Sequence, residues 1–213
     1  MNKRKFLLLL AGSPGTGKTY FIKMLTDKYS DIYVVTPDEA KIYYAEKIGF
    51  NNLEERQMLE RNKVWPFFYK ALDLYMEAGK KVVVSEYPFS DKQKGILSKL
   101  AKKYNYEVIT IRLIADFEIL WKRRYLRDRN EDRHLSFIMN NYHYGDTCDN
   151  LNRATNQITK EEFRQIIQDR QYEKFQLGEL IEINVNDYDK VDYSSVIDDL
   201  VNRFEQDNLK KST

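Results

Sequence analysis

Residues 12–19 read GSPGTGKT and combine glycines, a lysine and a hydroxyl side chain in the spacing G-x-x-x-x-G-K-[ST]. Glycines let backbone N–H groups turn inward around an anion, because no Cβ stands in the way. The lysine can reach the β- and γ-phosphates of a nucleoside triphosphate, and the threonine can offer its hydroxyl to Mg²⁺. The stretch therefore predicts a phosphate-binding loop that uses ATP and Mg²⁺ as cofactors.

The flanking residues support this interpretation. The apolar run FLLLLA precedes the loop directly, and an amphipathic helical pattern follows it, which is the strand–loop–helix context that the motif requires. A glycine-rich turn with a solvated lysine is the alternative, and it does not account for both flanks. The predicted cofactor-binding residues are the loop, the next residue and one distant arginine: Gly12, Ser13, Pro14, Gly15, Thr16, Gly17, Lys18, Thr19, Tyr20 and Arg133.

A carboxylate follows the second apolar run, at Asp38 in the sequence TPDE. Because the carboxyl ends of parallel strands meet at one edge of an open α/β sheet, Asp38 is expected to face the same crevice as the loop. There it can accept a proton from an acceptor hydroxyl or hold Mg²⁺ through water. Alternatively, Asp38 caps the next helix. Position alone does not separate these roles, and both can hold.

A second strand-end carboxylate is Glu86 in VVVSEYP, residues 82–88. Three branched apolar residues suit a strand beside the phosphate loop, so Glu86 is a candidate, with Thr19, for the magnesium side of the site. The alternative is a strand-end carboxylate in solvent.

The run KRRYLRDRNEDRH begins at residue 122 and has six cationic residues among residues 122–133, against three acidic ones. Arginines stabilise the charge that spreads over a transferring phosphoryl group. Arg123 and Arg127 are therefore predicted to be catalytic together with Lys18 and Asp38. A solvated helix face with i,i+4 ion pairs is the alternative for such a run.

The elements that must position these residues follow from the apolar pattern. Strands are expected at residues 5–11, 32–36, 81–85, 107–113 and 180–185, each rich in Val, Ile or Leu as strands buried on both faces should be. Helical patterns alternate with them at residues 18–29, 38–49, 52–78, 92–104, 116–129, 160–176 and 194–204. Pro66 is expected to kink the third of these helices or divide it in two. This alternation predicts a parallel sheet with helices on both faces.

Two regions between the regular elements are candidates for substrate contacts. The polar stretch at residues 130–159 is a candidate border of a mobile lid. The aromatic residues of the third helical region either form an acceptor pocket or fill the core: Trp65, Phe67, Phe68, Tyr69 and Tyr75.

Composition narrows the class of protein. The chain of 213 residues suits one α/β domain, and its net charge of +2 gives no general reason to bind nucleic acid or an anionic membrane. The single Cys148 excludes an internal disulfide and fits a cytoplasmic location. No window approaches the roughly 20 apolar residues of a membrane span.

These features, in this order, resemble the P-loop kinases that include zeta-toxin-like and polynucleotide-kinase-like proteins, and more broadly adenylate, gluconate and shikimate kinases. The resemblance implies an α/β P-loop NTPase fold: a five-stranded parallel sheet of order 2-3-1-4-5 with helices on both faces and a helical lid. It implies that Asp38 activates the acceptor, and that LWKRRYLR at residues 120–127 begins the lid. The nucleotide base is implied to lie near the lid arginines and residues 186–188.

The resulting prediction is one domain over residues 1–213, with a helical acceptor-side insertion at about 50–79 and a lid at about 122–160. The predicted function is transfer of the γ-phosphoryl group of Mg·ATP to a hydroxyl of a small-molecule or nucleotide-type acceptor. Two alternatives stay open. One is a polynucleotide 5′-kinase, so nucleic acid is a possible but not favoured partner. The other is a nucleotide-dependent switch or regulatory ATPase that transfers nothing.

Overall fold

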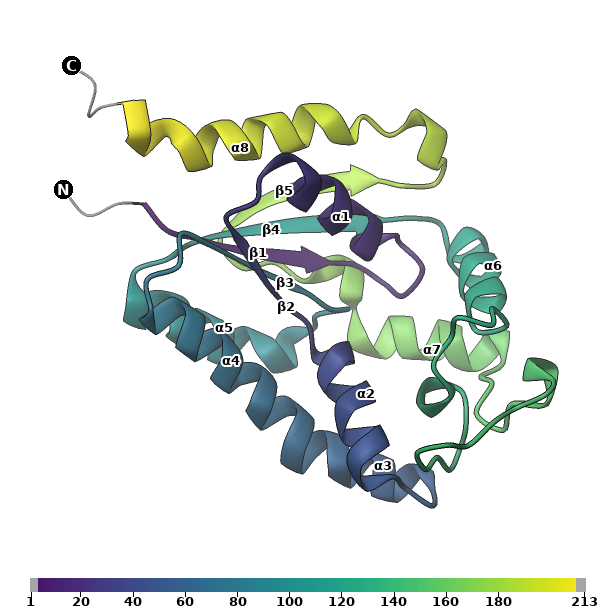
Figure 1. The fold of residues 1–213 in the computed structure, drawn as a ribbon. Coiled ribbons are helices and arrows are strands. Elements are labelled where there is room, and N and C mark those ends of the chain that lie inside the picture. The colour runs from purple at the N-terminus through teal and green to yellow at the C-terminus, as the bar shows by residue number, and fades with distance from the viewer. Residues whose placement is uncertain (1–3, 210–213) are drawn as a thin grey trace.

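A computed structural model describes residues 4–209, with side chains up to residue 206. Its centre is a five-stranded parallel sheet of order β2-β3-β1-β4-β5 (Figure 1). The strands are β1 Phe6–Ala11, β2 Ile32–Val35, β3 Val82–Glu86, β4 Glu107–Ile114 and β5 Glu179–Asn184. The fold class implied by the resemblance is therefore confirmed.

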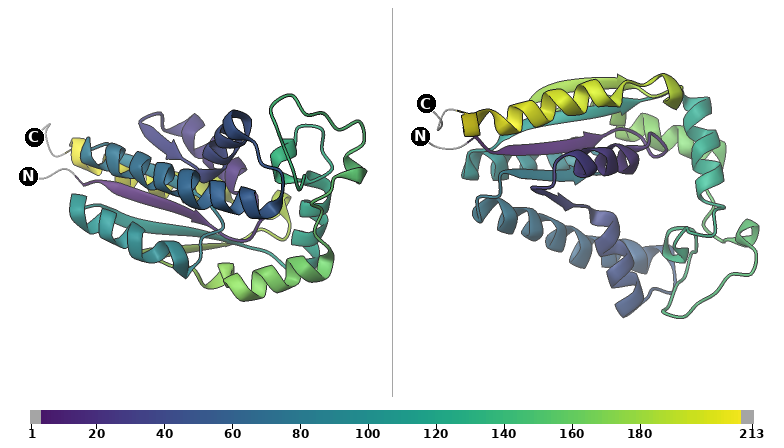
Figure 2. Two further views of the ribbon diagram at one scale, coloured as in Figure 1. Left: turned by 90° about the horizontal axis from the view of Figure 1, so that it is seen from below. Right: turned by 45° about the horizontal axis from the view of Figure 1, so that its top comes forward.

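Helices cover both faces of the sheet, as Figures 1 and 2 show. The helices are α1 Lys18–Lys28, α2 Pro37–Ile48, α3 Leu53–Leu59, α4 Trp65–Glu77, α5 Asp91–Tyr104, α6 Phe117–Arg127, α7 Lys160–Arg170 and α8 Tyr193–Leu209. No helix among the residues described is long and apolar enough to cross a membrane.

The alternation of side chains along β1 divides the core in two. Phe6, Leu8 and Leu10 face a cluster completed by α1 and α8, whereas Leu7 and Leu9 face one completed by α4 and α5. All of these side chains are fully buried, because a central parallel strand carries helices on each side. This core fixes the end of β1, from which the phosphate loop leaves.

Most predicted boundaries agree with the structure within two residues, and two expectations are wrong. The helix expected to run to residue 176 ends at Arg170, because Gln171 adopts a left-handed conformation (φ 49°) that breaks the hydrogen-bond ladder. Strands β2 and β5 are not buried on both faces. They lie at the two edges of the sheet, and most of their side chains are half-buried or exposed.

The region around Pro66 is one irregular helical stretch and not two separated helices. A π-helical segment, Glu60–Val64, joins α3 to α4, and Pro66 lies in the first turn of α4. A proline there removes a backbone donor that has no partner inside the new helix anyway. The stretch runs alongside α2, near the carboxyl ends of β2 and β3 (Figure 1).

The polar stretch between α6 and α7 holds two short 3₁₀ turns, Leu135–Phe137 and Leu151–Arg153. It crosses to the connection between α2 and α3, where Phe50 and Tyr142 exchange backbone hydrogen bonds of 2.9 and 2.8 Å. A small apolar cluster of Phe50, Tyr142 and Ala45 lies under this bridge. We call residues 128–159 the lid segment, and Figure 1 shows it beside α2 and α3.

Candidate active site

The loop between β1 and α1 has the backbone geometry that its glycines allow. Gly12, Gly15 and Gly17 have φ values of 125°, 95° and 82°, a region that other residues rarely adopt. A Cβ on Gly12 would lie 2.2 Å from the carbonyl oxygen of Leu113, so a side chain has no room there. The loop is therefore built as the motif predicts, and its N–H groups precede the positive end of α1.

Lys18 folds back over this loop. Its ammonium group donates hydrogen bonds to the carbonyl oxygens of Gly12 (3.0 Å) and Ser13 (3.1 Å). Burial, together with the like charge of Arg127, lowers the pKa of Lys18 to about 8, against the opposing effect of Glu86. The lysine is thus a buried cation held beside the cavity, and phosphate oxygens suit it better than carbonyl oxygens do.

Thr19 and Glu86 meet because β3 is paired with β1. The pairing sets Glu86 beside Leu10, and the Thr19 hydroxyl donates a 2.9 Å hydrogen bond to Glu86 Oε1. The other oxygen, Oε2, is buried without a hydrogen-bond partner among the described residues. Burial raises the pKa of Glu86 despite the hydrogen bond from Thr19.

This pair fits Mg²⁺ or a water bound to it. Magnesium prefers oxygen ligands and uses one or two carboxylates together with phosphate oxygens and waters. Glu86 offers an unsatisfied buried oxygen, and Thr19 offers a hydroxyl at the start of α1. No cluster of three or more His, Cys, Asp or Glu side chains suited to a metal occurs in the described part of the chain.

Asp38 lies in the first turn of α2 and does not cap it. Thr36 is the N-cap, and its hydroxyl accepts a hydrogen bond from the Asp38 backbone N–H at 3.3 Å. The interpretation of Asp38 as the cap is therefore wrong, and its side chain is left to face the cavity. Burial opposes ionisation of Asp38, but Lys41, whose ammonium donates a 3.0 Å hydrogen bond to it, holds the pKa of this carboxyl below its usual range. Asp38 is thus charged near neutral pH.

Asp128 lies beside three arginines of the run at residues 122–133, two of which, Arg127 and Arg133, were predicted site residues. This carboxylate is only 8% exposed and lies 3.2 Å from Arg124, 3.4 Å from Arg127 and 3.4 Å from Arg133. The pair Arg124–Asp128 is an i,i+4 pair at the end of α6, whereas Arg133 returns from the lid segment. One buried carboxylate therefore fixes the end of α6 and the start of the lid segment together.

The cluster carries more positive than negative charge. Burial, with the like charge of Arg127, lowers the pKa of Arg133 to about 10. The Nε atoms of Arg124 and Arg133 are buried and lie within ion-pair distance of Asp128, but they make no hydrogen bond within the described structure. One carboxylate faces three arginines, so an anion in this cavity would be stabilised.

Arg123 points in another direction. It donates hydrogen bonds to the carbonyl oxygens of Val185 (2.8 Å) and Asn186 (3.1 Å), and its guanidinium lies 3.5 Å from the centre of the Tyr188 ring. The Tyr188 hydroxyl in turn donates to the carbonyl oxygen of Gly15 at 3.1 Å. Arg123 thus connects the segment after β5 with the phosphate loop, whereas the cluster with Arg127 faces Lys18.

One cavity of about 580 Å³ unites most of the predicted residues. Its wall contains Pro14, Gly15, Gly17, Lys18, Thr19, Asp38, Glu86, Arg123, Arg127 and Arg133. Tyr20 does not contribute its side chain, because the ring is exposed and packs edge-on against Tyr193. Ser13 and Thr16 are buried beneath the loop, where Thr16 donates to the Ser13 carbonyl oxygen at 3.0 Å.

Several residues of this wall were not expected from the sequence: Lys41, Arg56, Tyr87, Arg124, Leu126, Phe137 and Tyr172. The sequence could have indicated Lys41, because it follows Asp38 by three positions on a helix, which is the spacing of an ion pair. Nothing in the sequence indicated Tyr172, because it reaches the cavity only through the irregular turn after α7. None of the aromatic residues predicted for α4 lines this cavity. Phe68 is fully buried in the core, and Trp65, Tyr69 and Tyr75 are half-buried against the same cluster, whereas Phe67 is exposed.

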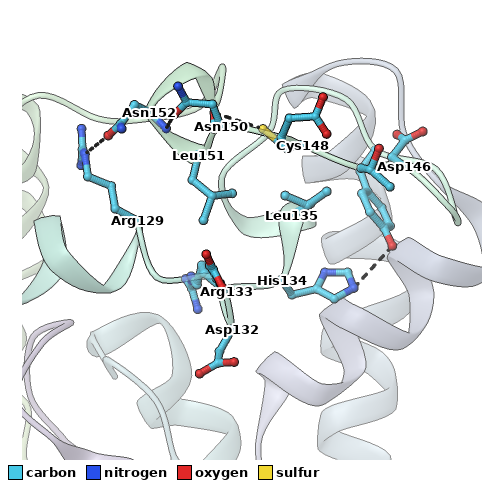
Figure 3. A pocket seen from close by; sticks show the side chains of 14 residues that line it. Arg129, Asp132, Arg133, His134, Leu135, Asp146, Cys148, Asn150, Leu151 and Asn152 are labelled. Carbon is cyan, nitrogen blue, oxygen red and sulfur yellow. Dashed lines mark hydrogen bonds between the residues drawn. The ribbon is translucent and has the colours of Figure 1, made fainter.

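A larger cavity of about 720 Å³ lies within the lid segment (Figure 3). It shares Arg133 with the first cavity, and its other labelled side chains come from the two 3₁₀ turns, as Leu135 and Leu151 do, or from the loops beside them, as Asp132, Asp146 and Cys148 do. These side chains bond mainly within their own loops. Cys148, for example, donates to the carbonyl oxygen of Asn150 at 3.3 Å. We therefore assign the chemistry to the smaller cavity, where the loop, the carboxylates and the arginines meet.

The sheet order, the loop and the strand-end carboxylates define a P-loop nucleotide-binding fold of the kinase type. A profile of the zeta toxin family matches residues 1–182. The match spans most of the chain, so the protein belongs to the zeta toxin family.

Solved structures agree on the fold. A protein from Chloroflexus aurantiacus that is assigned as a kinase superposes with a TM-score of 0.71 at 17% identity, over 93% of this chain and 97% of the other. The tunicamycin resistance protein of Deinococcus radiodurans gives a TM-score of 0.51 at 18% identity, with coverages of 94% and 95%. A gluconokinase from Sinorhizobium meliloti gives 0.51 at 10% identity, with both chains fully covered. No curated protein sequence matches this chain significantly.

Proposed function

We propose that this protein is an ATP-dependent phosphotransferase that moves the γ-phosphoryl group to a hydroxyl of a small-molecule or nucleotide-type acceptor. The observation that carries the proposal is the shared cavity, whose wall contains Lys18, the charged carboxylate of Asp38 and several arginines. A hydrolase needs only the phosphate side. Asp38 does not cap α2, so its carboxylate, just after the end of β2, is available to an acceptor hydroxyl.

In the proposed reaction, the acceptor oxygen forms a bond to the γ-phosphorus, and the bond from that phosphorus to the β–γ bridging oxygen breaks. ADP leaves, and the hydroxyl proton passes to Asp38. Lys18 and Arg127 neutralise the charge on the transferring group, which is the main requirement of a loose transition state. Asp38 orients the hydroxyl, and its lowered pKa keeps it in the form that accepts the proton.

The residues suited to Mg²⁺ are Thr19 and Glu86. A bound ion would neutralise part of the charge on the phosphates during transfer. The raised pKa of Glu86 has its main cause in burial, and a nearby cation would favour its ionised form. The hydrogen bond from Thr19 to Glu86 keeps these two side chains together beside the phosphate loop.

We assign the proposed acceptor side to the helical stretch at about residues 50–79 and the proposed lid to about 122–160. Both contribute to the wall, through Arg56 on one side and Arg127, Arg133 and Phe137 on the other. Closure of such a segment excludes water, which favours transfer over hydrolysis. The proposed nucleotide base lies near Tyr188 and Arg123, on the side of the loop opposite α2.

The test offers γ-labelled ATP and Mg²⁺ with pools of metabolites, nucleosides, sugars and 5′-hydroxyl oligonucleotides. We expect one labelled phosphomonoester. Asp38→Asn is expected to lower its formation about 10²–10⁴-fold, since it removes the proton acceptor. Glu39→Gln is the matched control, because this neighbouring acid does not line the cavity.

Two outcomes would contradict the proposal. Acceptor-independent hydrolysis that Asp38→Asn leaves unchanged would favour the regulatory ATPase. A labelled oligonucleotide as the sole product would favour the polynucleotide 5′-kinase.

A further inference from the structure

A further cavity of about 440 Å³ adjoins the proposed active site. It lies between the π-helical stretch, the loop from β3 to α5 and the end of α7. Tyr87, Pro88 and Tyr172 line both cavities, so the two spaces are neighbours. An extended molecule with its hydroxyl at Asp38 would pass these three residues to reach the second cavity.

The far side of this cavity is cationic. Arg61, Lys92 and Arg170 line it from three different elements, and all three are exposed. Because they come from separate elements, their convergence is a property of the tertiary fold and not of one charged helix face.

The neighbouring carboxylates already have partners. Glu60 pairs with Arg56 at 3.3 Å, and Asp91 pairs with Lys94 at 3.7 Å. Asp169 accepts a 2.7 Å hydrogen bond from Gln165. Glu60 is the one acidic residue in the wall of the cavity, so the three cations there outnumber it.

The remaining wall suits an organic ligand more than a free ion. The ring of Trp65 is half-buried and meets Tyr87 edge-on, with 5.0 Å between the ring centroids. Gln57 and Gln93 add amide groups that can donate and accept hydrogen bonds. Aromatic surface beside a few polar groups is the usual composition of a small-molecule site.

We propose that the acceptor is an extended molecule with an anionic group, a phosphate or a carboxylate, that Arg61, Lys92 and Arg170 bind in this second cavity while its hydroxyl lies at Asp38. We call the second cavity the anion subsite. This inference rests on the proposed phosphotransferase function and adds the chemical class of the acceptor.

The test uses acceptors that differ only in the distal group. For a series of carbon-chain lengths, kcat/KM is measured for α,ω-diols, for the hydroxyalkyl phosphates and for the hydroxycarboxylates of equal length. At one optimal length, an anionic compound should exceed the diol by about tenfold or more. The two anionic series distinguish a phosphate ligand from a carboxylate ligand.

The variant Arg61→Gln/Lys92→Gln/Arg170→Gln should remove most of this preference. The measured quantity is the ratio of kcat/KM for an anionic acceptor to that for a diol. A variant that loses activity toward both acceptors equally leaves this ratio unchanged. Lys94→Gln is the matched control, since Lys94 is a cation of the same helix that lies outside the subsite. Equal rates for diols and anionic acceptors at every length, or a preference that the triple variant keeps, would overturn the inference.

A binding measurement separates this inference from the proposed function. The chain has two tryptophans, so Trp121→Phe leaves Trp65 as the sole indole reporter. We expect 4-nitrophenyl phosphate to quench Trp65 saturably, and the neutral 4-nitrophenyl glucoside to quench it far less. The three glutamine substitutions should abolish the difference. If no acceptor is phosphorylated, the proposed function fails. If both probes quench alike, the anion subsite fails, whatever the turnover.

Discussion

Lys18 is a buried cation in the phosphate loop, and burial lowers its pKa from 10.5 to about 8. Between these two values the unfolded chain binds a proton that the folded protein has released, so stability rises with pH across this window. We expect the free energy of unfolding of the wild type, minus that of Lys18→Met, to increase by on the order of 3 kcal/mol from pH 8 to pH 10.5. Urea unfolding without nucleotide measures it.

Taking the difference from Lys18→Met cancels the titration of other groups, such as the tyrosines. Parallel stability curves for the two proteins across this window would show that Lys18 is not buried as described.

Asp128 is the carboxylate on which three arginines converge. Asp128→Asn removes the charge that compensates them and leaves the cations buried, so we expect a loss of about 3–5 kcal/mol in the free energy of unfolding. Inorganic phosphate should restore part of this loss, and should stabilise the variant more than the wild type. Denaturant titrations with and without phosphate measure both effects.

Asp132→Asn is the control for this experiment, since Asp132 is an exposed acid of the same lid segment. A variant at Asp128 that is as stable as this control would mean that the arginines do not depend on the shared carboxylate.

The sequence predicted the residues of the phosphate loop from local spacing alone, because eight consecutive positions make that site. It did not predict Asp128, although Arg124 and Asp128 have the spacing of a helical ion pair. What makes Asp128 central is Arg133, which reaches it after the chain has left the helix. The hydrogen-bond partners of Arg123 could not be predicted from local sequence either, because Val185 and Asn186 lie at the end of another strand.

At the scale of elements, the lid segment is attached to the α2–α3 connection by one backbone bridge and one buried ring. Tyr142 supplies both and is 5% exposed. Tyr142→Ala keeps the backbone but removes the ring, so we expect the lid segment to open more often and to be cleaved several-fold faster near residues 140–157 in limited proteolysis. Mass spectrometry of the fragments locates the cuts.

Tyr144→Ala is the matched control, because Tyr144 is a tyrosine of the same loop that is 79% exposed. Equal cleavage of the two variants and the wild type would contradict an attachment through Tyr142.

Strands and helices were largely predictable because apolar periodicity reports burial directly. The errors occur where a boundary depends on tertiary contacts. Gln171 ends α7 in a left-handed conformation without the glycine that usually marks such an end. The exposure of β5 follows from its place at the sheet edge, which the strand's own residues do not reveal.

For the whole molecule, 35 basic residues nearly balance 33 acidic ones. Affinity for nucleic acid depends on many phosphate contacts, and each contact steepens the salt dependence. We expect no detectable binding of a 5′-hydroxyl oligonucleotide at about 150 mM salt, measured by fluorescence anisotropy. Binding that persists there, with a steep fall at higher salt, would instead favour a strand that occupies both cavities.

The strand order could be implied only through the resemblance, because periodicity predicts that strands exist and not which are neighbours. The order matters for the site, since β3 beside β1 is what brings Glu86 to Thr19. The sequence did not predict Arg56 and Arg61, the cations on the proposed acceptor side, for a similar reason. Their helical stretch has no local motif, and its position against the sheet edge is a property of the complete fold.

The hydrogen bonds from Lys18 to its own loop affect the thermodynamics of nucleotide binding. They connect the carbonyl groups of Gly12 and Ser13, which gives the loop a defined shape. Nucleotide binding would then replace the hydrogen bonds from Lys18 to these carbonyls by hydrogen bonds to phosphate oxygens, and it would order little additional backbone. In this sense the loop is preorganised. Calorimetry should therefore find a heat-capacity change for nucleotide binding that is small compared with that of coupled folding and binding.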